Sequence, residues 1–219
     1  RGDLQADGHE KSRVALSDQV RGKISELIHN RTLVGGDVII EQRLAEKLGV
    51  SRTPLREALQ RLEGEGMVQK SSGRSYLVRK VEFQEYLQSF KVRLLLEPEA
   101  AAATALRAPE AKVQAIRMEI AMLRSLPDQH TEAHWRSDDN LHRMVGMYCG
   151  NAVLFDMIEK LRVTTRLYEI QDLRQQVSKD LEQHGAIIEA IAAGDGAAAR
   201  KAMQAHLRSL INHSLRQVA

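Results

Sequence analysis

The sequence has one cysteine, few aromatic residues and no long apolar run, and each shortage excludes a class of protein. A single cysteine, Cys149, cannot form a disulfide within the chain, so a disulfide-stapled secreted fold is excluded. Aromatic residues are 4% of the 219 residues while alanine and leucine are abundant, which favours packed helices over a β-sandwich. No apolar stretch approaches the ~20 residues of a membrane span, and no secretory leader is visible. These shortages predict a cytoplasmic protein without a membrane partner.

Positive charge is concentrated in the first part of the chain. Residues 1–80 carry 15 Lys and Arg against 11 Asp and Glu, whereas residues 81–219 carry 17 against 18. A protein that binds nucleic acid uses basic side chains to neutralise phosphates. The basic excess therefore favours nucleic acid as a partner of the first part, and the length suits two modest domains.

Two short helices are predicted on either side of Gly49, because glycine commonly ends a helix. The second begins in a polar turn, where Thr53 can cap the helix and Pro54 fits its first turn. One face of this second helix is apolar, and Arg52 and Arg56 point away from that face. A short helix, a tight turn and a second helix with a basic outer face are typical of a helix-turn-helix that reads DNA.

A β-hairpin is predicted after these helices. Residues 67–70 and 76–78 are short extended segments around a polar turn that contains Gly73. After a helix-turn-helix, such a hairpin is interpreted as a wing. Gly73 would let the backbone approach DNA closely, and Arg74 could reach a phosphate or the minor groove. An ordinary surface hairpin is the alternative.

The start of the chain has no apolar periodicity. Residues 1–15 are polar and mixed in charge, so they are predicted to form a flexible lead-in. A first helix is predicted from about Ser17 to the loop at Gly35 and Gly36. Residues 16–80 would then form the DNA-binding domain, and residues 81–219 a second domain.

Helical patterns continue almost without interruption from Val81 to the end of the chain. Six helices are predicted, over about residues 82–106, 109–125, 129–149, 151–175, 178–193 and 195–216. The predicted fold class is mainly α: an N-terminal winged helix-turn-helix with a small β-hairpin wing, and a C-terminal antiparallel bundle of about six helices.

Four side chains in the predicted bundle could bind a metal ion. Asp138 and His142 are four residues apart, so both project from one face of a helix, while His184 and His206 lie on two other helices. One carboxylate and three imidazoles suit a divalent transition ion such as Zn²⁺, Ni²⁺ or Mn²⁺. From spacing alone this signal is weak, and a surface helix pair with unrelated structural or solvated histidines is the preferred interpretation.

The segment from Ser51 to Leu59, followed by Arg61-Leu62-Glu63 and Gly66, resembles the DNA-binding domain of the GntR family of bacterial winged-helix regulators. The likeness runs from about Leu16 to Val81. It implies that Arg52 and Arg56, with Thr53 between them, contact DNA. It also implies that Ser72, Gly73 and Arg74 lie at or beside the wing tip. Gln42 is also predicted to contact DNA, but it stands where the best-known member has arginine, so the operator sequence cannot be carried over.

The second part of the chain resembles the ligand-sensing helical domain of the FadR-like subfamily, which is called the FCD domain. The likeness is carried by Arg93-Leu94-Leu95-Leu96-Glu97-Pro98-Glu99, by Asp138-Asp139-Asn140-Leu141-His142, and by His184 and His206 with their flanks. Six helices rather than seven resemble the shorter, VanR-like variant. The resemblance implies that Asp138, His142, His184 and His206 bind a metal ion that helps to hold a small carboxylate effector.

Arg93 is a candidate contact for that effector, because a buried guanidinium binds a carboxylate with two parallel hydrogen bonds. An ion pair with Glu97, one helical turn away, is its alternative role. Arg162 and Arg166 are weaker candidates, for which a solvated helix face is the preferred interpretation.

Together these observations predict a homodimeric regulator of transcription, not an enzyme, which binds a short palindromic operator. We expect it to act as a repressor that a small organic acid releases from DNA. Two alternatives remain open from the sequence. The Asp and three His residues could instead activate a water for hydrolysis, or they could hold a purely structural metal in a regulator that answers to another protein.

Overall fold

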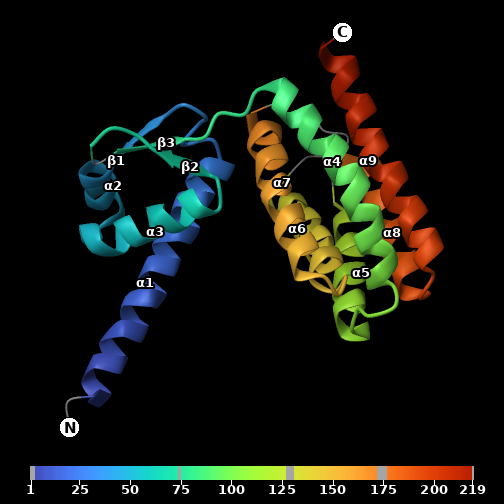
Figure 1. Ribbon diagram of the computed structural model, residues 1–219, viewed down its shortest axis with the longest axis horizontal. Helices are drawn as coiled ribbons and strands as arrows, with labels where there is room; N and C mark the ends of the chain where they lie inside the picture. The colour runs from blue at the N-terminus through green and yellow to red at the C-terminus, as the bar shows by residue number, and fades with distance from the viewer. Residues whose placement is uncertain (1–2, 74, 127–130, 172–176, 219) are drawn as a thin grey trace. The chain divides into compact units, whose positions relative to one another are not determined.

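A computed structural model describes the backbone of residues 3–73, 75–126, 131–171 and 177–218 (Figure 1). Side chains are described for residues 15–73, 75–126, 131–170 and 179–216. The chain divides into two compact units, residues 1–83 with 163–173 and residues 84–162 with 174–219. The first unit includes a late segment of the chain that the sequence assigned to the second domain.

In its described part the first unit contains three whole helices, α1 (Asp3–His29), α2 (Glu41–Leu48) and α3 (Arg52–Gly64), together with the end of a later helix, α7 (Ala152–Gln171). Apolar residues at helical spacing form its core because they place one stripe of each helix against a neighbour. The buried stripes are Val20, Ile24 and Ile28 on α1, and Leu55, Ala58, Leu59 and Leu62 on α3. Helices α1 and α3 pack directly against each other. The apolar stripe predicted for the second helix of the helix-turn-helix is therefore buried.

The predicted start of the first helix was wrong. Helix α1 begins at Asp3 instead of about Ser17, so most of the predicted lead-in is helical. Residues 3–16 contain no proline, so no residue in this stretch blocks a helix. Ser17 is fully buried, and apolar periodicity begins beside it, which marks where the helix joins the core and not where it starts.

The turn between α2 and α3 has the predicted glycine end. Gly49 adopts φ 66°, and its N–H donates to the carbonyl oxygens of Ala45 and Glu46. The predicted cap of α3 was wrong, because Ser51 occupies the N-cap position and Thr53 lies inside the helix. Pro54 lies in the first turn, as predicted, where its missing N–H has no partner to lose.

We expect Gly49→Ala to lower the free energy of unfolding by about 1 kcal/mol, because the left-handed backbone brings the new Cβ close to the following carbonyl oxygen. Beyond Gly49 itself and its two chain neighbours, a Cβ there meets no atom within 4 Å, so backbone strain is the only cost. Gly22→Ala is the matched control, since exposed Gly22 lies inside α1 and its Cβ also meets nothing within 4 Å. It should stabilise by about 0.5–1 kcal/mol. Thermal unfolding followed by circular dichroism measures both, and shifts of the same sign would contradict this account.

A small antiparallel sheet completes the first unit. Its described strands are β1 (Val38–Ile40), β2 (Val68–Lys70) and β3 (Ser75–Val78), in the order β1-β3-β2. Strands β2 and β3 form the predicted hairpin, with Val68 opposite Val78. Strand β1 was not predicted, because it has only three residues and its partner β3 lies far along the chain.

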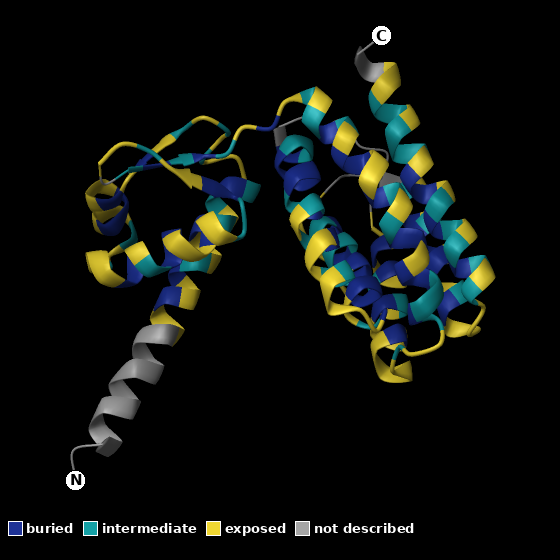
Figure 2. Cartoon of the chain, viewed as in Figure 1, coloured by how far each residue is buried: buried dark blue, intermediate teal, exposed yellow. Residues whose placement is uncertain are grey.

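The second unit is built from helices α4, α5, α6, α8 and α9 and from the first part of α7, up to Arg162. Their bounds are α4 (Phe83–Thr104), α5 (Glu110–Arg124), α6 (Glu132–Met147), α7 (Ala152–Gln171), α8 (Val177–Ala192) and α9 (Gly196–Val218). Within the described ranges these are the six predicted helices, so the predicted fold class is confirmed. Helix α8 packs against α5 and α9, and α5 packs against α6. Buried residues line the helix faces that meet inside the bundle (Figure 2).

Within residues 3–73, 75–126, 131–171 and 177–218, each helix is too short or too polar to cross a lipid bilayer.

Candidate functional site

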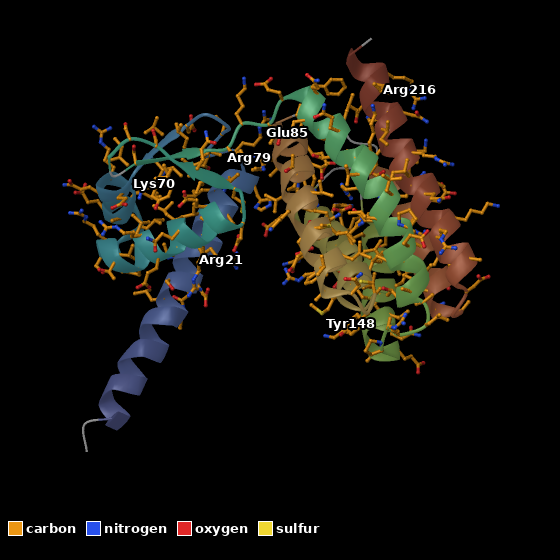
Figure 3. The ribbon with its side chains drawn as sticks, in the orientation of Figure 1. Arg21, Lys70, Arg79, Glu85, Tyr148 and Arg216 are labelled. Carbon is orange, nitrogen blue, oxygen red and sulfur yellow. The ribbon has the colours of Figure 1, made fainter. Side chains whose placement is uncertain are left out.

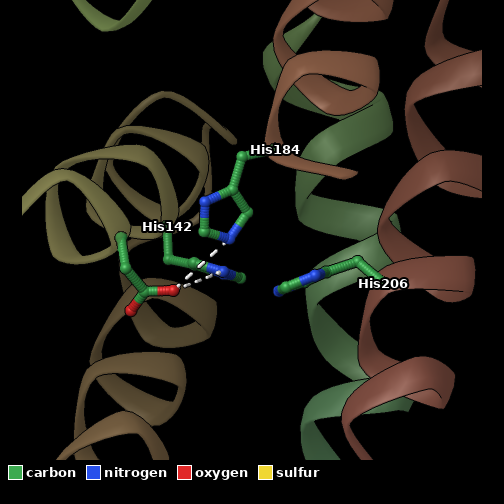
Figure 4. Close-up of side chains that lie close together, drawn as sticks. His142, His184 and His206 are labelled. Atoms are coloured by element: carbon green, nitrogen blue, oxygen red, sulfur yellow. Dashed lines mark ion pairs between the residues drawn. The ribbon is translucent and has the colours of Figure 1, made fainter. Parts of the chain in front are cut away.

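Three helices of the second unit bring the four predicted metal-binding side chains together. Asp138 and His142 come from α6, His184 from α8 and His206 from α9 (Figure 4). One potential ligand atom of each lies within 4.8 Å of those of the other three. Asp138 Oδ1 lies 3.4 Å from His184 Nε2 and 3.6 Å from His142 Nε2. All three imidazoles are buried. We call these four residues the Asp-His cluster.

The outer nitrogen of two imidazoles is held by a neighbouring side chain. His142 Nδ1 lies 2.5 Å from Glu97 Oε2, and His206 Nδ1 lies 3.1 Å from Gln183 Oε1. Burial lowers the pKa of both histidines, and His184 lowers that of His206 further. A neutral imidazole that donates from Nδ1 carries its lone pair on Nε2. The Nε2 atoms of His142 and His206 are therefore lone-pair donors directed into the cluster.

Glu97 is a buried carboxylate that links two elements of the site. Burial by itself would raise its pKa, but the charge of Arg93 and the hydrogen bonds that His142 and Arg93 donate outweigh that effect and hold the pKa well below its usual range. As a carboxylate Glu97 can only accept, so His142 must donate its Nδ1 proton. Arg93 Nε donates to Glu97 Oε1 at 2.5 Å. This triad fixes the ring orientation and raises the basicity of His142, as outer carboxylates do for metal-bound histidines.

Arg93 is 3% exposed, and its guanidinium carbon lies 4.6 Å from the centre of the Phe90 ring. The ion pair with Glu97, which the sequence left as the alternative, is present. This pair places Arg93 beside the Asp-His cluster, one side chain removed from His142. Its role as an effector contact stays a prediction.

The second oxygen of Asp138 is bound by an arginine. Arg162 Nη2 donates to Asp138 Oδ2 at 2.8 Å and to Asp139 Oδ1 at 2.6 Å. Asp138 thus directs one oxygen to the histidines and the other to α7. The solvated face expected for Arg162 and Arg166 was wrong, because their exposed fractions are 7% and 8%. Arg162 is buried against Asp138 and Asp139, and Arg166 Nη1 lies 3.6 Å from Glu169 Oε2.

The residues present fit a divalent transition ion. Three imidazoles and one carboxylate are the ligands that zinc and its neighbours prefer. Within the described residues, the buried Nε2 atoms of His142 and His206 have no hydrogen-bond partner. Such atoms are costly to bury unless a ligand satisfies them. Glu97, Gln183 and Arg162 are the outer residues that spacing did not reveal. Glu97 alone had a local signal, its position four residues after Arg93.

We expect Glu97→Gln to lower metal affinity by ~10–100-fold, the usual effect of losing an outer-shell partner of a ligand histidine. The amide keeps the shape of the side chain but removes the charge that orients His142 and balances Arg93. Glu99→Gln is the matched control, because Glu99 lies on the same helix, is exposed and pairs with Arg200. Competition with a chromogenic chelator measures the affinity of each folded variant. Equal affinities for the two would contradict the assigned role of Glu97.

The predicted DNA-binding side chains lie on the surface of the first unit. Arg52, Thr53 and Arg56 are exposed on α3, and Gln42 is exposed on α2. Arg56 donates from Nη2 to Glu41 Oε2 at 3.0 Å and also from Nε to both carboxylate oxygens. Glu41 is 4% exposed, so it anchors the guanidinium from within the fold. The sequence did not predict this anchor.

The hairpin tip is also exposed. Ser72 and Gly73 lie in the turn between β2 and β3, and Gly73 adopts φ 68°. The hydroxyl of Ser75 donates to the Ser72 carbonyl at 2.7 Å and closes the turn. Lys70 ends β2 close to this tip (Figure 3). The predicted contact of Arg74 lies outside the described residues.

Two family models match consecutive parts of the chain. Residues 16–78 match the model described as "Bacterial regulatory proteins, gntR family", and residues 88–209 match the model of the FCD domain. A protein of Escherichia coli (strain K12), named "Putative L-lactate dehydrogenase operon regulatory protein", is 31% identical over 222 residues, which cover 88% of this chain and 83% of that protein.

A second relative is the "HTH-type transcriptional regulator LutR" of Bacillus subtilis (strain 168), which is 27% identical to this chain. The alignment covers 84% of this chain and 94% of that protein. Among solved structures, E. coli McbR/YncC has a TM-score of 0.73 at 20% identity, and covers 93% of this chain and 99% of that chain. At that identity the likeness shows the fold alone.

Proposed function

Because the chain belongs to the GntR family of bacterial regulators and carries an FCD domain, we propose a role for that domain. In this proposal the FCD domain is a metal-dependent sensor of a small organic acid. The chain is a DNA-binding regulator of transcription, as its family and its relatives are. Beyond this role, we propose that the effector is a carboxylate bound at the Asp-His cluster. Its binding would release the regulator from an operator that it represses.

The convergence of four donor atoms within 4.8 Å in a buried interior carries this proposal. A divalent ion held there would act as a Lewis acid that attracts a carboxylate oxygen to an open coordination position. The chain's own residues prepare the site. Glu97 and Gln183 orient two imidazoles, and Arg162 orients Asp138.

The name of one relative suggests which acids to test. The E. coli relative is named for an L-lactate dehydrogenase operon, so lactate and other short hydroxy acids are the first probes for this chain. A hydroxy acid can present a carboxylate and a hydroxyl oxygen to the same ion. Arg93, joined to the cluster through Glu97, is the predicted cationic contact for a carboxylate.

The response would arise because the cluster joins three helices. Asp138 and His142 on α6 face His184 on α8 and His206 on α9, so a ligand that changes their spacing favours one helix packing over another. In a homodimer that binds a palindromic operator, such a shift changes how two recognition helices are presented to DNA. We propose that the chain is a repressor and that the acid weakens its binding to DNA.

Thermal stabilisation of the zinc-loaded protein by organic acids tests the sensor. A binding acid should stabilise by RT ln(1 + [L]/Kd), about 2.7 kcal/mol at 100 times Kd, and the same acid should weaken operator binding in a gel-shift titration. Chelated protein and His206→Ala should show neither effect. If no acid stabilises the protein and chelation unfolds it, the metal is structural and the proposal of an acid sensor is wrong. If the protein hydrolyses an ester or amide and a chelator stops this activity, the alternative function of a metal-dependent hydrolase is favoured.

A further inference from the structure

The two arginines on the exposed face of α3 differ in how the fold holds them. Arg52 has neither a hydrogen bond nor an ion pair among the residues that the structure describes. Arg56, one helical turn later, donates from Nη2 to Glu41 Oε2 at 3.0 Å. It also donates from Nε to both carboxylate oxygens, at 3.3 and 3.4 Å. A carboxylate of α2 therefore orients the second guanidinium, whereas no neighbouring group orients the first.

The carboxylate that holds Arg56 is buried, although the guanidinium itself is not. The side chain of Glu41 is 6% exposed and that of Arg56 is 46% exposed. A carboxylate at this depth is costly to bury unless a cation pairs with it. Within the described part of the chain, Arg56 is the ion-pair partner that Glu41 has. Burial of Glu41 thus depends on Arg56, and Arg56 takes its orientation from Glu41.

Glu41 leaves one edge of the Arg56 guanidinium available to a further acceptor. A guanidinium carries five N–H donors in one plane, and Glu41 occupies the edge formed by Nε and Nη2. The outer edge, formed by Nη1 and the second N–H of Nη2, remains. Because the group is planar, the contact on the inner edge also sets the direction of the outer edge. An outer edge of this kind can donate two parallel hydrogen bonds to a guanine or to a phosphate.

We propose that Glu41 determines specificity for the operator, by orienting Arg56 and by cancelling its charge. Non-specific binding comes from net positive charge that releases counterions from phosphates. Together with the carboxylate of Glu41, Arg56 contributes no net charge, so it gains little from a phosphate at an arbitrary position. A pair of acceptors that meets the outer edge is still bound, because the guanidinium needs no further ordering. Glu41 is then a positioning residue that acts through Arg56.

Glu41→Gln tests this role, because glutamine keeps the shape of the side chain and removes its charge. The probes are two duplexes of equal length, one selected from a random library by the wild-type protein and one unselected. Gel-shift titrations at several salt concentrations give the ratio of the two affinities and the salt dependence of each. The ratio should fall by ~10-fold or more, the effect of losing one oriented arginine contact. Binding to the unselected duplex should tighten and release about one more counterion per protomer.

Glu63→Gln is the matched control, because Glu63 is exposed on the same helix as Arg56 and has no ion pair among the described residues. It changes the net charge equally, so it can tighten binding to both duplexes, but the ratio should stay within about twofold of the wild type. Glu41→Asp separates orientation from charge. The shorter side chain keeps its charge and withdraws the carboxylate from Arg56 by one C–C bond. It should lower the ratio and leave the salt dependence unchanged.

Arg56→Ala gives a second readout that does not depend on DNA. It leaves the Glu41 carboxylate buried without its cation, so the melting temperature should fall. Adding Glu41→Gln should recover part of that loss, because the buried charge is then gone. In the binding assay, Glu41→Gln should not change the ratio further once Arg56 is absent, since the two residues act as a unit.

The inference is wrong if Glu41→Gln keeps the wild-type ratio, or if Glu63→Gln lowers the ratio as much. It is also wrong if Glu41→Gln lowers the ratio equally in the Arg56→Ala protein, because Glu41 would then act through another residue. If Arg56→Ala binds the selected duplex with wild-type affinity, the predicted contact between Arg56 and DNA fails too. These results leave the proposed acid sensor untouched, because that proposal is tested by thermal stabilisation with organic acids.

Discussion

Replacing His184 by alanine is expected to leave the purified protein without stoichiometric metal. His184 Nε2 lies 3.4 Å from Asp138 Oδ1, and its ring centre lies 4.7 Å from that of His206, so it stands between the ligands of α6 and α9. Loss of a ligand should lower metal affinity by more than the ~10–100-fold expected for loss of a residue that only orients a ligand. Elemental analysis after dialysis measures the metal content directly.

His213→Ala is the control for this experiment, because His213 lies on α9 outside the Asp-His cluster. It should keep a full complement of metal. Circular dichroism establishes that both proteins are folded. Equal metal content in the two variants would remove His184 from the ligand set, and with it the proposed site. The acid response of His184→Ala should be lost along with the metal.

Arg52→Ala is expected to weaken operator binding by ~30-fold or more. A lost arginine contact costs about 1–3 kcal/mol, and a dimer on a palindrome loses two of them. Arg52 is exposed at the first position of α3, so its removal should leave the fold intact. Gel-shift titration at fixed salt measures the effect, because affinity for DNA depends steeply on salt.

Arg208→Ala removes the same charge from an exposed position on α9 and serves as the control. Its operator affinity should stay within about twofold of the wild type, since it keeps both recognition helices. If Arg52→Ala also binds with wild-type affinity, the DNA-binding role given to α3 is wrong. If both variants weaken equally, the effect is one of net charge and not of a specific contact.

Apolar periodicity predicted most of the fold because each helix buries one stripe. It located α3 and the six helices of the second unit to within a few residues. It misplaced the start of α1, because an exposed helix can extend beyond the residues that pack. Strand β1 was missed because three residues carry no periodicity, and its pairing with β3 depends on the folded chain.

The candidate site was less accessible to sequence reasoning. The spacing of Asp138 and His142 is a local property of one helix, whereas their approach to His184 and His206 depends on how three helices pack. That convergence was predicted only by family resemblance. The prediction for Arg162 was wrong because α7 buries polar residues, including Thr164 and Thr165. Polar residues on this helix therefore do not mark its solvent-exposed face. No local pattern distinguishes a buried ion pair from a solvated one.

The cluster also bears on how long the protein survives in a cell. His142 and His206 are 64 residues apart in the chain, so a shared ion would close a long loop, a constraint that for a covalent link of this length is worth about 4 kcal/mol. Proteases degrade chains that open, and a change of a few kcal/mol alters abundance several-fold. The turnover of this regulator would then follow the supply of metal.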